Sequence, residues 1–202
     1  KAIRRQRQMC IRDRVLTYHF FQTQFTGGFI GVDIFFTFSG FLITSLMVDE
    51  FARSDNFKLM AFYGRRFYRI VPPLFIAVLL VLPLTYLIDH DFVTDIGKQV
   101  AAALGFTTNY FEIATGGSYE NKFIPHLFVH TWSLAVEMHF YILWGLIAWL
   151  VAKISRRLAS GRRALTRFRW GLGLLTTAFA IESFVTVSYT HLRAHETLAN
   201  LV

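Results

Sequence analysis

The stretch that decides the fold is Gly31-Val32-Asp33-Ile34-Phe35-Phe36-Thr37-Phe38-Ser39-Gly40-Phe41-Leu42-Ile43-Thr44. It is an apolar run of the kind that crosses membranes, and it carries a single carboxylic acid at Asp33. An ionisable residue inside a spanning segment is costly, and it usually faces a protein interior or a water-filled cavity. Asp33 is therefore a candidate site residue. The alternative is that it lies at the membrane interface and only caps the helix.

The composition identifies an integral membrane protein. Of 202 residues, 54% are hydrophobic and 22 are Phe, and the charges lie in short clusters between apolar runs. Four runs approach the roughly 20 residues that a hydrocarbon core demands: 29–48, 70–88, 132–151 and 170–187. A further run, 15–21, is too short to span unaided. We predict an all-α, polytopic transmembrane helix bundle of about four to five spans plus a short re-entrant or interfacial helix, truncated from a larger domain.

The net charge of +8 indicates membrane topology and not binding to nucleic acid, because the basic residues lie between the apolar runs. The segment 152–169 contains seven basic residues and no acid, so we expect it on the cytoplasmic side. The segment 49–69, with five basic residues against three acids, should share that side. Residues 89–131 then begin and end outside, and their one apolar stretch, 100–111, is too short to cross. These assignments predict a multi-pass protein of the cell's inner (plasma) membrane.

Both ends of the chain resemble translated sequencing-adapter reads, at 9–14 and at 187–197. We therefore expect 1–14 and 187–202 to be artefactual and the partial membrane domain to cover 15–186. His191 and His195 stand four apart, as two metal ligands on a helix would, but the artefact interpretation outweighs that one. The single cysteine, Cys10, leaves the redox compartment open.

His19 ends the first short apolar run, and the Gly27-Gly28 turn after it would bring His19 and Asp33 to the same face of the membrane. A carboxylate orients a neighbouring imidazole and raises its basicity, so this pair could act as a general base. A buried histidine that only hydrogen-bonds to a neighbouring helix is the commoner case.

Two arginines, Arg66 and Arg69, lie three apart just ahead of Pro72-Pro73. On a helix they would share a face and form a fork suited to phosphate or pyrophosphate. The alternative is that they are topology anchors that also meet anionic lipid.

The third cluster is His130-Thr131-Trp132-Ser133-Leu134-Ala135-Val136-Glu137. It would place Trp132 at the outer interface and Glu137 inside the membrane, where the buried-acid argument applies again. His126 and His130 are four apart and could ligate a metal together with Glu137. Nothing supplies a convincing further ligand, so we predict no metal site.

Together and in this order, these clusters resemble the acyltransferase-3 family of multi-pass membrane O-acyltransferases, over roughly residues 15–149. The matching residues are Tyr18-His19, Gly31-Val32-Asp33-Ile34-Phe35-Phe36 to Ser39-Gly40-Phe41-Leu42-Ile43, Arg66-x-x-Arg69 and His130-Thr131-Trp132-Ser133-Leu134-x-Val136-Glu137-x-x-Phe140-Tyr141. The sequence departs from the family pattern at Gln8, where an arginine is usual, and at His139, where Gln or Glu is usual.

The resemblance implies transfer of an acyl group, usually acetyl, from cytoplasmic acyl-CoA to a hydroxyl of an extracytoplasmic glycan or lipid-linked acceptor. It implies that His19 is the catalytic residue and that Asp33 and Glu137 take part in orienting groups or handling protons. It also implies that Arg66 and Arg69 bind the coenzyme phosphates. Further candidates within the motifs are Ser39, His130, Trp132 and Ser133. The donor would be a substrate, and no bound cofactor is expected.

Two other interpretations stay open. Intramembrane acids and a re-entrant segment are also typical of transporters and flippases. A transporter has no need of a coenzyme-binding arginine pair beside a catalytic histidine, which favours the enzyme. The remaining alternative is an inactive, truncated fragment.

Overall fold

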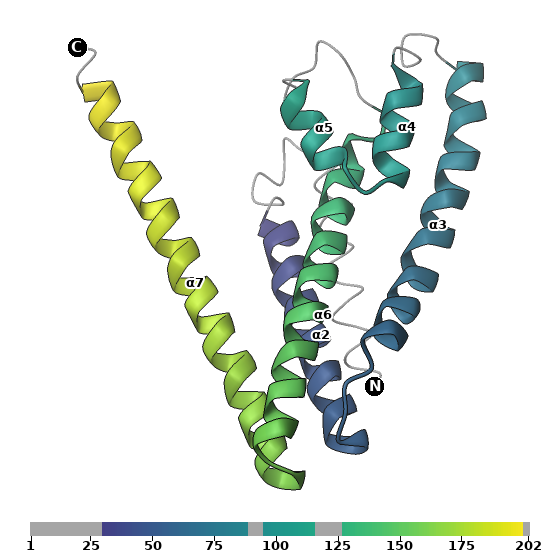
Figure 1. Ribbon diagram of the computed structural model, residues 1–202. Helices are drawn as coiled ribbons and strands as arrows, with labels where there is room; N and C mark the ends of the chain where they lie inside the picture. Colours follow the sequence, from purple (N-terminus) through teal and green to yellow (C-terminus); the bar gives the residue numbers. More distant parts are fainter. Residues whose placement is uncertain (1–29, 89–94, 116–126, 200–202) are drawn as a thin grey trace. The chain divides into compact units, whose positions relative to one another are not determined.

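The computed structural model describes residues 30–88, 95–115 and 127–199, and these residues form helices without any strand (Figure 1). In chain order the α-helices are α2 (Ile30–Ser54), α3 (Leu59–Ile88), α4 (Ile96–Leu104), α5 (Thr108–Ala114), α6 (Trp132–Leu158) and α7 (Gly161–Ala199). A short 3-10 helix, η2 (Val129–Thr131), leads directly into α6. The predicted all-α class is confirmed.

Four of these helices are long and apolar enough to cross a membrane. The candidate spans are Gly31–Ser54, Leu59–Leu87, Val129–Leu158 and Gly161–Thr190. They match the four predicted runs, but each is longer, because the helices continue into the basic segments at their ends. The helix α3 begins at Leu59 and not near residue 70, so the Arg66-x-x-Arg69 pair lies within the helix. The short run 15–21 lies outside the described residues.

The region between α3 and α6 contains no helix long enough to cross, among residues 95–115 and 127–131. Its apolar stretch is divided into α4 and α5 at Gly105 and Phe106, where the backbone of Phe106 turns left-handed, with φ of 54°. The amide of Gly105 donates to Ala101 O at 2.9 Å and that of Thr107 to Ala102 O at 2.8 Å, which closes the end of α4. The prediction that this apolar stretch is helical but too short to span is confirmed. The structure contains two short helices, α4 and α5, where one was predicted.

The chain divides into two compact units, and each is described by itself. Of the described residues, the first contains 30–38, 58–88, 95–115 and 127–147, and the second contains 39–57 and 148–199. In the first unit, Leu74 and Val78 of α3 form a core with Ala103 of α4 and with Phe128. Hydrogen bonds add to this core: the amide of Leu127 donates to Gln99 Oε1 at 2.8 Å, and the hydroxyls of Thr108 and Thr131 lie 2.8 Å apart. These contacts hold α4 and α5 beside the beginning of α6.

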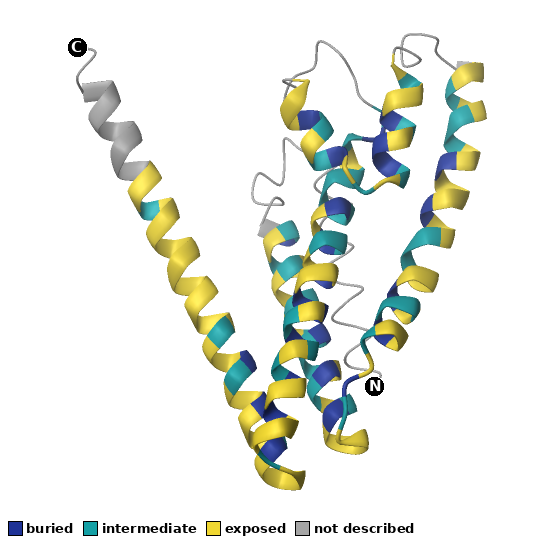
Figure 2. Ribbon diagram, viewed as in Figure 1, coloured by how far each residue is buried: buried dark blue, intermediate teal, exposed yellow. Residues whose placement is uncertain are grey.

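In the second unit, the core forms where α2 ends, α6 ends and α7 begins (Figure 2). Buried side chains of α2 recur every four residues, at Ile43, Met47 and Phe51. The Phe51 ring stacks on that of Phe168 with ring centres 4.6 Å apart. Buried small residues of α6 allow close helix packing: Ala148, Ala152 and Ser155. Between residues 173 and 190, α7 is mostly apolar and exposed, as a lipid-facing helix is.

Candidate active site

The first unit contains a buried charge on α3. Arg66 is only 8% exposed, although it lies within a candidate membrane span. Its guanidinium carbon lies 5.6 Å from the centre of the Phe62 ring, one helical turn earlier, and 5.5 Å from that of Tyr141 on α6. Aromatic faces attract cations more strongly where water is excluded, so the two rings help to hold the guanidinium in place.

A buried acid lies on the facing helix. Glu137 and Tyr141 are four residues apart on α6, and both are buried. The Tyr141 hydroxyl donates a hydrogen bond to Glu137 Oε1. The guanidinium of Arg66 lies over the ring of the same tyrosine. A cation, a phenol and a carboxylate therefore form one buried cluster, which is a costly arrangement to maintain in a membrane without a function.

Close packing of α3 and α6 brings this cluster together. The Tyr63 hydroxyl donates to Ile142 O at 2.7 Å. A Cβ atom at Gly145 would lie 2.9 Å from Tyr63 Cε1 and 3.1 Å from Phe62 Cε1, so glycine is needed for this approach. The two helices can lie this close only where α6 has no side chain.

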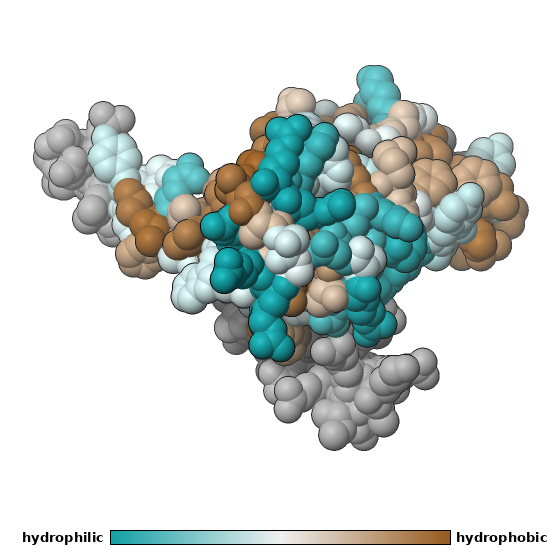
Figure 3. Space-filling view, turned by 60° about the horizontal axis from the view of Figure 1, so that its bottom comes forward, coloured by the Kyte–Doolittle hydropathy of each residue, from teal (hydrophilic) through white to brown (hydrophobic). Residues whose placement is uncertain are grey.

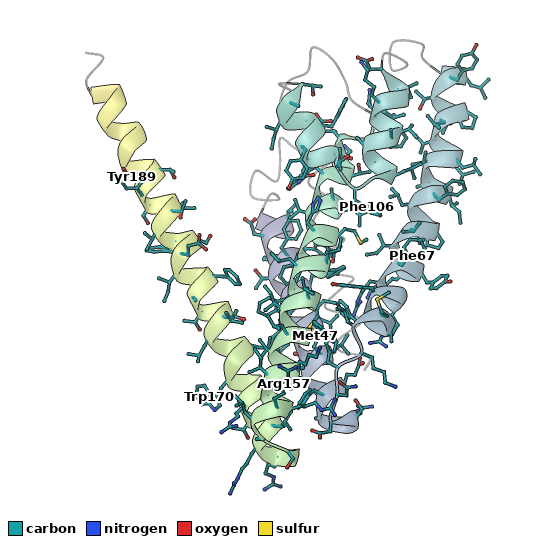
Figure 4. The ribbon with its side chains drawn as sticks, viewed as in Figure 1. Met47, Phe67, Phe106, Arg157, Trp170 and Tyr189 are labelled. Carbon is teal, nitrogen blue, oxygen red and sulfur yellow. The ribbon has the colours of Figure 1, made fainter. Side chains whose placement is uncertain are left out.

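A groove of about 320 Å³ opens beside the cluster. Its walls are mainly apolar, with Met60 and Phe67 contributed by α3 and Met138 and Ile142 by α6. Arg66 and Tyr141 also line it. Phe67, labelled in Figure 4, is 52% exposed, which is expected of a wall open to lipid.

The two arginines of the predicted pair differ in their exposure to solvent. Arg66 is buried and faces Tyr141, whereas Arg69, one turn later, is exposed. The positive charges of Arg69 and Arg65 repel the guanidinium of Arg66. An anion placed between Arg66 and Arg69 would relieve that repulsion. Their joint role in binding phosphate stays a prediction.

The other predicted residues of the first unit lie near the beginnings of α2 and α6. Asp33 is exposed in the first turn of α2, where a carboxylate also favours the helix dipole. One turn on, the ring of Phe36 lies 6.3 Å from that of Trp132, so the starts of the two helices are neighbours. Ser133 donates to the carbonyl of His130, whose side chain is exposed.

Several predictions cannot be placed against this geometry. His19, the predicted base, lies outside the described residues, and so does His126. Ser39 falls in the second unit and is half-buried. Among the described residues, no three side chains of His, Cys, Asp or Glu gather as ligands for one metal ion.

The sequence alone predicted no site role for Tyr141, Asn109 or His139. Asn109 Oδ1, His139 Nδ1 and Arg66 Nε are buried atoms without a hydrogen-bond partner in the part of the chain that is described. The ring of Tyr110 lies 5.5 Å from that of His139 in an edge-on arrangement. Such atoms are able to bind a polar ligand. The spacing of four between Glu137 and Tyr141 was the signal that could have identified Tyr141.

A comparison of the sequence with known protein families gives one match. The model of a family described as an acyltransferase domain, acyltransferase 3, matches residues 8–200. No solved structure matches the chain.

Named relatives come from Staphylococcus aureus. "O-acetyltransferase OatA" of strain NCTC 8325 / PS 47 is 34% identical over 133 residues, which is 66% of this chain and 22% of the relative. "Putative O-acetyltransferase SACOL0978" of strain COL is 32% identical over 163 residues, 80% of this chain and 26% of the relative. The chain thus spans about a quarter of the length of these relatives.

Proposed function

The chain belongs to the acyltransferase-3 family, and from that premise we propose that it forms part of a membrane O-acetyltransferase. Both relatives described above are named as O-acetyltransferases. Four helices long enough to cross a membrane agree with an enzyme that works in a bilayer. The membrane that we propose is the inner (plasma) membrane, with the basic segment 152–169, where α6 ends and α7 begins, in the cytoplasm.

The observation that carries the proposal is the buried cluster of Arg66, Tyr141 and Glu137 between two spans. It supplies a cation and an acid next to a mainly apolar groove of about 320 Å³. We propose that the donor is acyl-CoA, entering from the cytoplasm. Its phosphates would meet Arg69 and Arg66, because guanidinium groups pair well with phosphate oxygens.

The acceptor that we propose is a hydroxyl of an extracytoplasmic glycan or lipid-linked sugar. His19 would remove the proton of that hydroxyl, whose oxygen attacks the thioester carbonyl carbon. The bond between carbon and sulfur then breaks, and the thiolate of the coenzyme leaves and takes up a proton. Transfer through an acyl-histidine at His19 is the alternative route. Glu137, and Asp33 near the start of α2, would orient groups or handle protons.

A transporter or flippase fragment is the second candidate, since buried charges between spans also occur there. An inactive fragment is the third. The enzyme is favoured because both relatives carry the name of an O-acetyltransferase.

The test is acetyl transfer in membranes that contain His19→Ala or Glu137→Gln, assayed with labelled acetyl-CoA. His19→Ala should reduce transfer by about 100-fold or more if the histidine is a general base. The control is an equal amount of membrane-inserted protein. Near-normal transfer in His19→Ala would remove His19 from the mechanism, and absence of any transfer by the wild-type chain would favour the other two candidates.

A further inference from the structure

A second hollow lies in the other unit, at the end of α6. Its volume is about 340 Å³, and it is lined by Asn56, Trp149, Lys153, Arg156 and Arg157. None of these residues belongs to the proposed active site. Figure 3 looks onto this end of the molecule, where hydrophilic side chains gather.

The basic residues of the hollow share one face of α6. Lys153 follows Trp149 by four residues, and Arg156 follows Lys153 by three, so these three side chains lie one above the other on the helix. Arg157 is the next residue in the chain. Lys153 Nζ lies 4.5 Å from the centre of the Trp149 ring. This cation–π contact holds the ammonium group at the wall of the hollow. Arg157, labelled in Figure 4, lies in the last turn.

The charge of the hollow is uniform. Three of the described lining residues are basic, none is acidic, and Asn56 adds an amide that can donate hydrogen bonds. Cations near the end of a helix also favour its dipole and fix topology, so basic residues alone do not indicate a site. These three basic residues differ from ordinary topology anchors because they all line one hollow, together with the ring of Trp149.

Not every basic residue of this region has that role. Arg167 Nη1 donates to the carbonyl of Leu158 at 2.5 Å and so closes the end of α6. Arg162 and Arg163 are exposed in the first turn of α7 and do not line the hollow. The beginning of α7 therefore provides controls that carry the same charge at nearby positions.

We propose that the hollow between Asn56, Trp149, Lys153, Arg156 and Arg157 binds the phosphate of an anionic ligand. Guanidinium and ammonium groups that converge on a small volume match the charge and the acceptor oxygens of a phosphate ester. Two sources carry this chemistry: a soluble nucleotide phosphate, such as that of a coenzyme, and the headgroup of an anionic phospholipid. Binding at this hollow does not require acyl transfer by the chain.

The experiment measures binding to the full chain in neutral detergent by native mass spectrometry. One arm titrates adenosine 3′,5′-bisphosphate, and the other titrates dioleoylphosphatidylglycerol. The variant Arg156→Gln/Arg157→Gln is compared with Arg162→Gln/Arg163→Gln, which removes the same charge outside the hollow. We expect affinity for at least one probe to fall by about tenfold or more in the first variant only, the scale of lost charge-assisted hydrogen bonds.

The pattern of losses identifies the ligand. Loss in the first arm alone indicates a nucleotide phosphate, loss in the second alone indicates a lipid headgroup, and loss in both indicates a general phosphate site. Lys153→Gln, a single change on the exposed surface, repeats the test should the double variant fold poorly. Equal affinities in the hollow variants and the control, or no binding of either probe by the wild-type chain, would overturn the proposal.

Discussion

The guanidinium of Arg66 lies over the ring of Tyr141, 5.5 Å from its centre, while the hydroxyl of the same ring donates to Glu137. The face of the Tyr141 ring therefore contacts a cation of α3, and its hydroxyl hydrogen-bonds to an acid of α6. The contact with Arg66 and the hydrogen bond to Glu137 can be removed separately, which makes the cluster open to experiment.

Tyr141→Phe removes the hydrogen bond to Glu137 and keeps the ring over Arg66. We expect a loss of about 1–3 kcal/mol of folding stability, because a buried carboxylate loses a hydrogen-bond donor. If Glu137 must be held in place for acyl transfer, kcat should fall while the KM for the donor stays the same. Thermal unfolding in detergent and acetyl-transfer kinetics measure the two effects.

The matched control is Tyr68→Phe, because Tyr68 is 78% exposed on α3. It should change neither stability nor kcat. Equal behaviour of the Tyr141 and Tyr68 variants would contradict a role for the hydrogen bond.

The two arginines of α3 should respond differently to lysine. Arg66→Lys should reduce stability, since a lysine cannot reproduce the planar contact with the Phe62 and Tyr141 rings. Arg69→Lys preserves an exposed charge and should leave stability unchanged. If Arg69 binds the coenzyme phosphates, its lysine variant should bind acyl-CoA about tenfold more weakly. Thermal unfolding and acyl-CoA affinity in nanodiscs distinguish the two residues, and unchanged donor affinity in Arg69→Lys would make that arginine a topology anchor.

Gly145 should tolerate no side chain. A methyl group there would meet the rings of Tyr63 and Phe62, so Gly145→Ala should push α3 from α6 and cost about 1–3 kcal/mol. Gly64→Ala is the control, because a Cβ at Gly64 has no neighbour within 4 Å, and alanine there favours the helix. The comparison is made by thermal unfolding of both variants in one detergent. Equal stability of the two would refute the close approach.

The topology can be tested with two cysteines placed singly in a chain with Cys10→Ser. Ser160 lies between α6 and α7, and Lys98 lies in α4 with a side chain that is 72% exposed. Because the segment 152–169 on both sides of Ser160 is rich in basic residues, we expect Ser160 in the cytoplasm and Lys98 on the other side. A membrane-impermeant thiol reagent should label only Lys98→Cys in intact cells. Labelling of both cysteines from the same side would show the topology to be wrong.

The sequence by itself determined the four spans and the interruption between α3 and α6. Hydropathy over about 20 residues is a local property, and the bilayer demands it of any spanning helix. The acid at Glu137 could be identified for the same reason, since a carboxylate within an apolar run needs a partner wherever the run packs. Asp33, expected to be similar, is exposed in the first turn of α2. The sequence of an apolar segment does not show whether its first helical turn is buried or exposed in the folded protein.

Only the tertiary structure decided which partners meet. Arg66 and Arg69 look equivalent in the sequence, yet one is buried against Tyr141 and the other is exposed, because α3 turns one face to α6. That orientation depends on Gly145, which allows the helices to approach, and on the hydrogen bond from Tyr63 to Ile142 O. Both contacts join residues far apart in the chain. Helical periodicity determines which residues share a face of each helix, but tertiary packing determines which faces are in contact. The packing of α3 against α6 brings Arg66 together with Tyr141 and Glu137.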